Sequence, residues 1–395
     1  MGNAKGLTNR FLAVFGNVMK AITVLGIESS CDETAVAVVR RDDSGTHVLS
    51  NLIHSQVVKH AVYGGVVPEI AARAHVETID SLCALALKEA EASGEFAPDD
   101  LDAVAATAGP GLIGGVMVGL SFAKGYALAR GLPLISVNHL EGHALSARLT
   151  ADIAFPFLLL LVSGGHCQLL AVKGVGDYER MGTTIDDAAG EAFDKIAKVL
   201  GLGYPGGPAL EACARTGDAT RFTLPRALLG RKDCDFSFSG LKTAAAKIAH
   251  EQVKTEQDRA DLCAGVQAAI TRQLVERSQR AMAEFKTQNS VTGPAFVVAG
   301  GVAANTAIRE ALMGLCARNG FVFHAPPLQY CTDNGAMIAL AGLETYQQLL
   351  AEGRAERLTL AESMATLARP RWPLDPGRAE AEPVHKTAGR KGAKA

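Results

Sequence analysis

The chain has 395 residues, of which 48% are hydrophobic and 20% are charged, and its formal net charge at pH 7 is −2. This length predicts two lobes rather than one small core, and the composition is that of a globular enzyme. The near-neutral charge excludes a polycation built for nucleic acid, so any RNA contact must come from a local patch or from a partner.

The first twenty residues loosely resemble the start of a signal peptide, because Lys5 and Arg10 precede the apolar run 11–15. Lys20 interrupts that run, and no small-residue cleavage site follows it. We therefore expect residues 1–20 to be a disordered extension, or an upstream start with Met19 as the true first residue.

The first half is predicted to open with a β-hairpin, because the apolar runs 24–28 and 35–39 flank a polar turn. Apolar residues at three- and four-residue steps, or on nearly every side, predict helices further on. The other elements expected in this half are strands at 47–56, 103–106 and 134–137, a turn at 109–111, and helices at 68–90 and 112–129.

The second half repeats this order, starting with a hairpin whose strands, 157–162 and 166–172, flank Ser163-Gly164-Gly165. Its other expected elements are strands at 178–185, 295–299 and 321–324, helices at 188–200 and 303–318, a glycine turn at 300–301, and an inserted helical region at about 208–285.

Two copies of the same element order predict an α/β protein with two lobes, at 21–150 and 151–369, each around a mixed sheet. A βαβ pattern alone would suggest a doubly wound fold. The hairpin that opens each half favours instead the two-lobed actin-like ATPase fold of actin, Hsp70 and sugar kinases, with duplicated ribonuclease-H-like lobes.

Residues 370–395 change in composition to proline, glycine, alanine and charge, and four basic residues lie near the end: Lys386, Arg390, Lys391 and Lys394. This composition predicts a disordered tail. Such a tail either aids solubility or touches RNA phosphates.

The eight cysteines contain no CxxC pair, which argues against a disulfide framework and against a cysteine-ligated zinc module. A reducing, cytoplasmic location fits this usage best. No run of 18 apolar residues occurs, so we expect no membrane-spanning helix.

The sequence His139-Leu140-Glu141-Gly142-His143 follows an expected strand. On a helix, positions i and i+4 share a face, so both imidazoles can reach one metal ion. The motif is not the metalloprotease HExxH, because Leu140 stands where that motif carries its glutamate. Two helix-face histidines without a metal remain an alternative.

A two-histidine site needs a further ligand, and Asp333 in Cys331-Thr332-Asp333-Asn334-Gly335 is a candidate. The segment lies at an expected helix start, where Thr332 or Asp333 could equally serve as the N-cap. Two histidines and one carboxylate would leave open positions that suit iron(II) or zinc.

Several glycine clusters are candidate phosphate or nucleotide contacts. Ser163-Gly164-Gly165 exposes backbone N–H groups between two strands, and Gly300-Gly301 followed by Asn305 opens a helix, whose N-terminus attracts anions. Gly206-Gly207 follows Tyr204-Pro205. Each cluster alone could also be a plain turn, and none matches the P-loop or Rossmann pattern.

Three acidic residues are placed where they could act beside a nucleotide. Asp32 and Glu33 lie at the tip of the first hairpin, and Asp194 follows Gly190-Glu191-Ala192-Phe193. An acid at such a place could accept a proton or orient a nucleophile, although exposed acids in turns are usually only solvated.

Taken together, these motifs resemble the TsaD family, formerly called Gcp, over residues 22 to 345. The matching segments are 26–34, 109–112, 139–143, 161–166, 185–195, 204–208, 237–243, 299–305 and 332–336. Cys167 departs from the pattern, because many relatives carry threonine there.

The resemblance implies an actin-like fold and transfer of threonylcarbamoyl from threonylcarbamoyl-AMP to N6 of adenosine 37 in tRNAs reading codons that begin with A. It implies a divalent metal, iron(II) or else zinc, on His139, His143 and Asp333. It also implies that the adenylate contacts Leu161, Val162, Ser163, Gly164, Gly165, Asp194, Gly207 and Asn305.

The expected partners are tRNA, proteins of TsaB and TsaE type, and a TsaC-type enzyme that makes the adenylate. Asp32 or Glu33 is expected to accept the proton from the amine. Three rival functions stay open: an ATP-dependent small-molecule kinase, an O-carbamoyltransferase, and a nucleotide-gated scaffold without acyl transfer.

Overall fold

The computed structural model of the protein describes residues 21–63 and 65–381. The predicted extension at 1–20, with the choice between Met1 and Met19, lies outside the described residues, as do residues 382–395. Within the described part, no helix is both long enough and apolar enough to cross a membrane.

The first sheet has the strand order β3-β2-β1-β4-β5. The hairpin β1–β2 and the pair β2–β3 are antiparallel, whereas β4 and β5 join in parallel, as expected for strands separated by helices. The strands are β1 (Ile22–Glu28), β2 (Glu33–Asp42), β3 (Gly45–Ser55), β4 (Ala103–Gly109) and β5 (Leu134–Asn138).

The second sheet repeats this topology with the order β10-β9-β6-β7-β8, so the predicted duplication is confirmed. Its hairpin β6–β7 is antiparallel and β9 pairs with β6 in parallel. The strands are β6 (Phe157–Val162), β7 (Cys167–Gly174), β8 (Asp177–Thr183), β9 (Ala295–Ala299) and β10 (Val322–His324).

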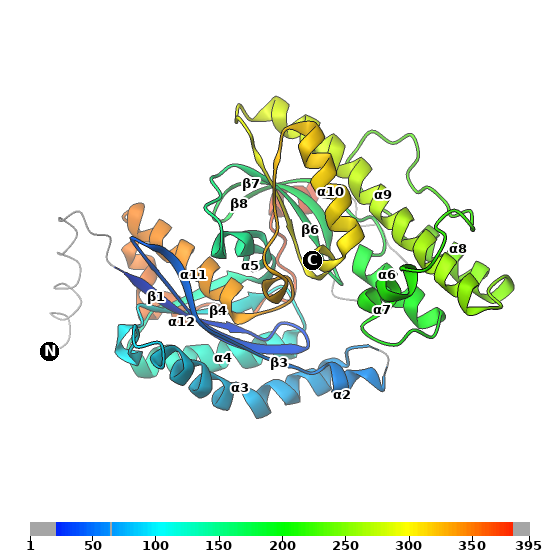
Figure 1. Cartoon of the computed structure of the whole chain (residues 1–395). Helices are drawn as coiled ribbons and strands as arrows, with labels where there is room; N and C mark the ends of the chain where they lie inside the picture. Colours follow the sequence, from blue (N-terminus) through cyan, green and yellow to red (C-terminus); the bar gives the residue numbers. More distant parts are fainter. Residues whose placement is uncertain (1–20, 64, 382–395) are drawn as a thin grey trace, which may run out of the picture.

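The helices pack against the two sheets or against one another (Figure 1). Those of the first half and the middle are α2 (Val57–Ala61), α3 (Pro68–Glu91), α4 (Ile113–Arg130), α5 (His139–Leu145), α6 (Ala189–Val199) and α7 (Gly206–Ala214). Those that follow are α8 (Ser239–Glu251), α9 (Glu256–Gln288), α10 (Thr306–Asn319), α11 (Gly335–Ala351), α12 (Leu360–Met364) and α13 (Pro376–Ala381). The predicted helical insertion at 208–285 corresponds to α7, α8 and α9.

Three apolar cores separate these layers. One lies between the first sheet and the pair α3–α4, and another lies between the second sheet and helices α6 to α10. The third joins the two sheets, because inward side chains of both meet α5 and α11. Burying one Leu or Val side chain contributes about 1.5–3 kcal/mol, so this third core holds the lobes together.

The predicted lobe boundaries need one correction. Helix α11 lies within the range assigned to the second lobe, yet it packs against β1, β2 and β4 of the first sheet. Met364 and Ala368 likewise pack into the core under α3 and α4. The chain therefore returns to the first lobe after β10, which helix periodicity alone does not reveal.

The prediction of a disordered tail from residue 370 is wrong for residues 370–381. The Trp372 carbonyl accepts a hydrogen bond from Asn138, Leu374 is buried, and α13 follows. Proline-rich composition predicts disorder only when no tertiary contacts exist, and here a folded body supplies them.

Candidate active site

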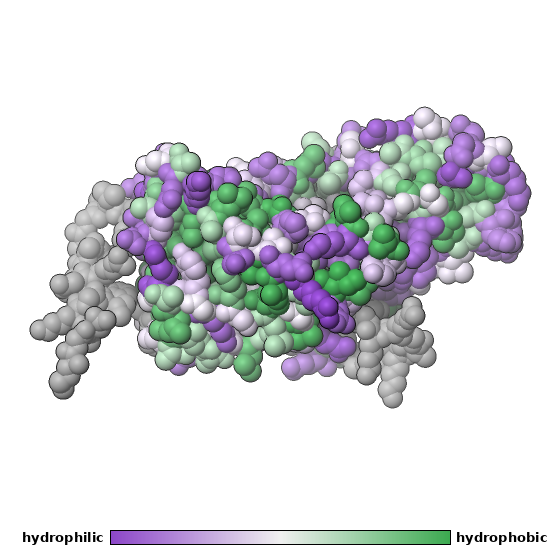
Figure 2. Space-filling model, turned by 90° about the horizontal axis from the view of Figure 1, so that it is seen from below, coloured by the Kyte–Doolittle hydropathy of each residue, from purple (hydrophilic) through white to green (hydrophobic). Residues whose placement is uncertain are grey.

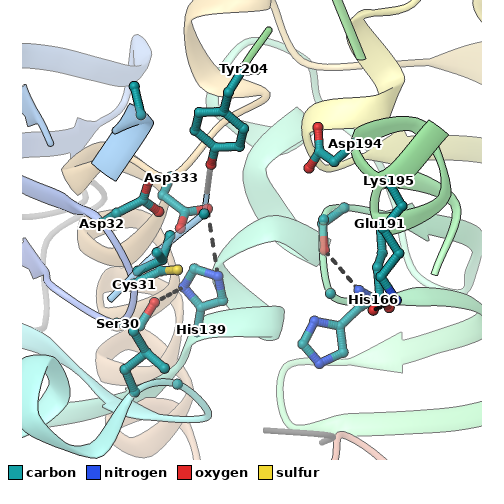
Figure 3. A pocket seen from close by; sticks show the side chains of 18 of the residues that line it. Ser30, Cys31, Asp32, His139, His166, Glu191, Asp194, Lys195, Tyr204 and Asp333 are labelled. Atoms are coloured by element: carbon teal, nitrogen blue, oxygen red, sulfur yellow. Dashed lines mark hydrogen bonds and ion pairs between the residues drawn. The ribbon is translucent and has the colours of Figure 1, made fainter. Parts of the chain in front are cut away.

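A cavity of about 970 Å³ lies between the two lobes, where the turns of both hairpins face each other. Figure 3 shows Asp32 and His139 on one side and Asp194 and Lys195 on the other. Of the predicted site residues, those that line the cavity are Asp32, His139, Ser163, Gly164, Gly165, Asp194 and Asp333.

The three predicted metal ligands meet at one edge of this cavity. Helix α5 begins at His139, so His139 and His143 lie one turn apart on the same face. The Asp333 carboxylate Oδ1 lies 3.0 Å from His143 Nε2 and 3.6 Å from His139 Nε2. One ligand atom from each of the three residues fits within a mutual distance of 4.8 Å.

The helix cap that the sequence suggested at 332–333 belongs to the next residue. The Asn334 side chain accepts a hydrogen bond from Met337 N at 3.0 Å and caps α11. Thr332 and Asp333 are therefore not the N-cap, and the Asp333 carboxylate is left to face the two histidines.

Glu28, at the end of β1, orients His139. Its side chain is fully buried, and its Oε2 lies 3.0 Å from His139 Nδ1, while Ser30 Oγ lies 3.1 Å from the same nitrogen. Thr107 donates a hydrogen bond to the same carboxylate. A carboxylate behind an imidazole is typical of metal-bound histidines, because it fixes the ring and leaves the far nitrogen for the metal.

Glu28 was missed in the sequence, although it belongs to a matching motif. Its signal is a single acid at the end of an otherwise apolar strand. A buried acid there must have partners, which makes it a candidate for a role in the site.

The charges of this cluster favour a bound cation. Burial opposes ionisation of Asp333, but His139 and His143 outweigh that effect and hold the pKa of Asp333 well below its usual value. Burial also opposes protonation of His139, yet the Asp333 and Glu28 carboxylates raise the pKa of His139 to about 9. Two imidazoles and one carboxylate that attract positive charge fit zinc or iron(II).

The two acids at the tip of the first hairpin, Asp32 and Glu33, differ in their position relative to the cavity. Asp32 lines the cavity, whereas Glu33 opens β2 and does not line it. Burial, with the Asp333 and Asp32 carboxylates, raises the pKa of Glu33 to about 10, so Glu33 holds a proton at neutral pH. Glu33 then donates a hydrogen bond to Asp32, and Asp32 is the acid of the pair that faces the cavity.

A buried histidine supports this turn from behind. His75 Nε2 lies 3.2 Å from the Cys31 carbonyl, and its Nδ1 lies 2.8 Å from Thr34 Oγ1. Burial lowers the pKa of His75, so the ring is neutral and donates from Nε2 to the carbonyl. These contacts fix the backbone on both sides of Asp32.

The facing turn of the second lobe, at residues 163–166, presents mainly backbone to the cavity. Ser163 N donates to the His166 carbonyl at 2.8 Å, and His166 N donates to Ser163 Oγ at 3.1 Å, which closes the turn. Gly164 and Gly165 are exposed, and a Cβ added to either would meet no atom within 4 Å. Leu161 and Val162 are 0% exposed, so they can reach a ligand only through their backbone.

Of the remaining predicted substrate contacts, only Asp194 reaches the cavity. Asp194 lines it and accepts a hydrogen bond from Gly206 N at 2.8 Å. Burial raises the pKa of Asp194, although hydrogen bonds from Gly206 and Gly207 oppose this rise. Gly207 and Asn305 do not line the cavity in the described part of the chain, and Asn305 Oδ1 accepts from Ile308 N to cap α10.

Several polar residues of the second lobe line the cavity and were not predicted. These are His166, Glu191, Lys195, Lys198 and Tyr204. Lys195 forms ion pairs with Glu191 at 2.6 Å and with Asp187 at 3.3 Å. Those on α6 could not be told from the ordinary polar face of a helix by sequence alone.

Comparisons with known proteins give one family over most of the chain. Residues 47–340 match the family described as tRNA N6-adenosine threonylcarbamoyltransferase, TsaD. A protein of that name from Caulobacter vibrioides is 64% identical over 377 residues, which cover 95% of this chain and 98% of the relative. Another from Maricaulis maris is 57% identical over 380 residues, covering 95% and 97% of the two chains.

Among solved structures, the chain is similar to HypF of T.kodakarensis, with a TM-score of 0.54 and 16% identity. The match covers 86% of this chain and 49% of HypF, so this chain spans about half the length of that protein. At this identity the likeness shows the fold alone, which is the two-lobed actin-like fold predicted from the element order.

Proposed function

The chain belongs to the TsaD family of tRNA N6-adenosine threonylcarbamoyltransferases, and from this premise we propose the reaction that it catalyses. It transfers the threonylcarbamoyl group of threonylcarbamoyl-AMP to N6 of adenosine 37 in tRNAs reading codons that begin with A, and it releases AMP. The observation that carries the proposal is the convergence of His139, His143 and Asp333 at the edge of a cavity large enough for a nucleotide.

The adenylate is proposed to lie along the second-lobe wall. The backbone of Leu161, Val162 and Ser163-Gly164-Gly165 leads to a turn whose exposed glycines let a phosphate approach the N–H groups. Asp194, with Gly207 and Asn305 behind it, is proposed to bind the nucleoside. This placement points the threonylcarbamoyl group toward the first-lobe wall.

The acceptor is proposed to enter from the open side, with its amine near Asp32. The N6 nitrogen attacks the carbamoyl carbon, a new N–C bond forms, and the bond from that carbon to the AMP oxygen breaks. One proton leaves N6, and Asp32 is the proposed acceptor, because it is the acid of the hairpin tip that lines the cavity. Since the mixed anhydride is an activated acyl donor, the protein mainly aligns the two substrates.

His139, His143 and Asp333 are proposed to hold the divalent metal, iron(II) by family resemblance with zinc as the alternative. When bound, such a metal supplies Lewis-acid polarisation of a carbonyl oxygen. Glu28 keeps the Nε2 atom of His139 directed at Asp333, and His143, whose side chain is 1% exposed, approaches the same carboxylate from inside the protein.

A TsaB-type protein is proposed as the partner at the outer helices of the first lobe, with TsaE-type and TsaC-type proteins acting alongside. Helices α3 and α4 pack together and expose five large apolar side chains: Val76, Leu85, Ile113, Met117 and Leu128. Figure 2 views the molecule from this side, and hydrophobic residues gather there among hydrophilic ones. Grouped exposed apolar residues support a protein interface.

The cysteines and the proposed substrate support a cellular location for the protein. All eight cysteines lie in the described residues and are free thiols. Free thiols and a tRNA substrate support a cytoplasmic location.

The test is reconstitution of the purified chain with synthetic threonylcarbamoyl-AMP, tRNA transcript and the partner proteins, with and without chelator. The proposal expects modified adenosine in tRNA, AMP in equal amount, and loss of both after metal removal. Transfer to small hydroxyl compounds instead of tRNA would favour an O-carbamoyltransferase. Phosphorylation of a small molecule would favour a kinase, and nucleotide binding without any transfer would favour a scaffold.

A further inference from the structure

Residues 366–375, which we call the strap, run along the first lobe at the edge of the cavity. Pro370 is one of the residues that line the cavity, next to Pro110 and Gly111 in the turn after β4. Composition predicted a disordered tail from residue 370 onward, yet the backbone of the strap is hydrogen-bonded at several points. The partners of these hydrogen bonds indicate the role of the strap.

The strap fits closely against the turn after β4. Arg369 N donates to the Ala108 carbonyl at 2.6 Å, and Gly111 N donates to the Pro370 carbonyl at 3.3 Å. Gly109 has a φ of +137°, and a Cβ added there would lie 1.7 Å from the Arg369 carbonyl oxygen. Only glycine permits this approach, so the turn and the strap form one continuous wall of the cavity.

The strap also contacts the start of the metal-binding helix. Asn138 caps α5, because its Oδ1 accepts from Leu140 N at 2.9 Å, and its Nδ2 donates to the Trp372 carbonyl at 2.8 Å. One amide side chain therefore bonds the helix with its oxygen and the strap with its nitrogen. His139 is the next residue after Asn138, so the strap is hydrogen-bonded to the residue that directly precedes a proposed metal ligand.

Both ends of the strap are fixed, and they are fixed to different lobes. Lys124 on α4 donates to the Thr366 carbonyl at 2.6 Å. At the other end, Arg180 N in β8 donates to Asp375 Oδ2 at 2.9 Å, and Leu374 is buried beside it. The strap thus spans from the first lobe to the second along the edge of the cavity.

We propose that the strap is a positioning element of the active site, which completes the cavity wall through Pro370 and holds the Asn138-capped start of α5. This inference rests on the proposed function, because it assumes that α5 carries the metal and that the cavity takes the adenylate. It predicts that the metal and the adenylate each bind more weakly when the strap is removed.

The test compares two truncated chains with the full chain. One ends at Ala365 and lacks the strap, and the matched control ends at Asp375 and keeps it. Binding of Co²⁺ is followed by its visible absorption, and binding of a non-hydrolysable threonylcarbamoyl-AMP analogue by calorimetry. Loss of the strap is expected to weaken the affinity for Co²⁺ and the affinity for the analogue by about tenfold each, and to change the Co²⁺ spectrum. Tenfold is the lower end of the effect on metal affinity of residues that bond to metal ligands. The control is expected to remain within about twofold of the full chain.

A single substitution covers the case in which the shorter chain does not fold. Asn138→Ser keeps a capping oxygen, since serine and asparagine cap equally well, but loses the amide that reaches Trp372. It is expected to weaken Co²⁺ binding about threefold to tenfold, while the melting temperature of the apoprotein falls by only a few degrees, as expected for the loss of one hydrogen bond. Unchanged Co²⁺ affinity in Asn138→Ser, or in the strap-less chain, overturns the proposal.

The same measurements distinguish failure of the proposed transfer reaction from failure of the proposed role of the strap. If the full chain binds Co²⁺ and the adenylate analogue but transfers nothing to tRNA, the proposed function fails while the strap proposal is still tested by binding. If the full chain transfers normally and strap loss leaves both affinities unchanged, only the strap proposal fails.

Discussion

The two walls of the cavity are built in opposite ways. The first-lobe wall presents side chains that are held from behind: Glu28 orients His139, and His75 fixes the turn that carries Asp32. The second-lobe turn presents backbone, with Gly164 and Gly165 exposed and nothing within 4 Å of an added Cβ. Asp32 and the two glycines come from the same position, the first hairpin turn, of two lobes with the same topology.

This difference suggests a division of work after duplication of one lobe. Fixed side chains suit steps in which charge or a proton moves, because their position costs no reorganisation during the reaction. Exposed backbone suits recognition of a phosphate, because N–H groups can approach it closely. Removing a side chain from the first wall should therefore lower kcat, whereas adding one to the second wall should raise KM.

The largest effect is expected from the metal ligands themselves. His139→Ala should lose bound metal and reduce transfer by ~10²–10³-fold or more, the range seen when a stabiliser of a developing oxyanion is removed. Metal content and transfer rate are measured on the same sample. His250→Ala, on an exposed face of α8, is the matched control and should change neither. Normal transfer by metal-free His139→Ala would contradict the metal role.

The next effect separates the two acids at the hairpin tip. Asp32→Asn removes the proposed proton acceptor and should lower kcat by ~10²–10⁴-fold with little change in the KM for the adenylate. Glu33→Gln should cost much less, because Glu33 is protonated and glutamine can still donate a hydrogen bond to Asp32. Equal losses in the two variants would show that Asp32 has no special role.

A smaller effect is expected from the residue behind the metal ligand. Glu28→Gln keeps the shape but removes the charge that faces His139 Nδ1, so metal affinity should fall by about 10–100-fold. Added metal should restore part of the activity. Glu141→Gln is the control on the same helix, because Glu141 bonds Gly176 and Tyr178 instead and should leave metal affinity unchanged. A similar fall in both variants would argue for general disturbance of α5.

The sequence predicted the elements well because their signals are local. Alternating and continuous apolar runs placed all the strands of both sheets within a few residues, and the opening hairpins indicated the duplicated fold. Two of the proposed metal ligands could also be predicted, because His139 and His143 are four residues apart and so lie on one face of a helix. Asp333 was a candidate ligand from its place at an expected helix start, with a role as helix cap left open, and the family resemblance then implied it as a ligand.

The parts that the sequence missed depend on contacts between distant segments. The sequence shows that the first half of α11 is apolar on every side, but not that it packs on the first sheet. Glu28 reads as a strand residue until His139, more than a hundred positions later, lies beside it. The strap from residue 370 onward was predicted to be disordered, because its order comes from hydrogen bonds of the strap to Ala108, Gly111 and Asn138 rather than from its own composition.

The smallest expected effect tests the second wall directly. Gly165→Ala adds one methyl group that meets no protein atom within 4 Å, and its backbone does not need a positive φ, so the fold should tolerate it. Because the methyl group projects into the space assigned to the adenylate, KM should rise about tenfold while kcat stays near that of the parent, a cost of about 1.4 kcal/mol in binding. Gly240→Ala, equally open but on α8 away from the cavity, should change neither constant. Gly190→Ala would place its Cβ 2.6 Å from the Ser163 carbonyl and should lower the melting temperature as well, which distinguishes disturbance of the turn from obstruction of the ligand. If Gly165→Ala lowered kcat and left KM unchanged, the second wall would take part in the chemical step, and the division between the two walls would be wrong.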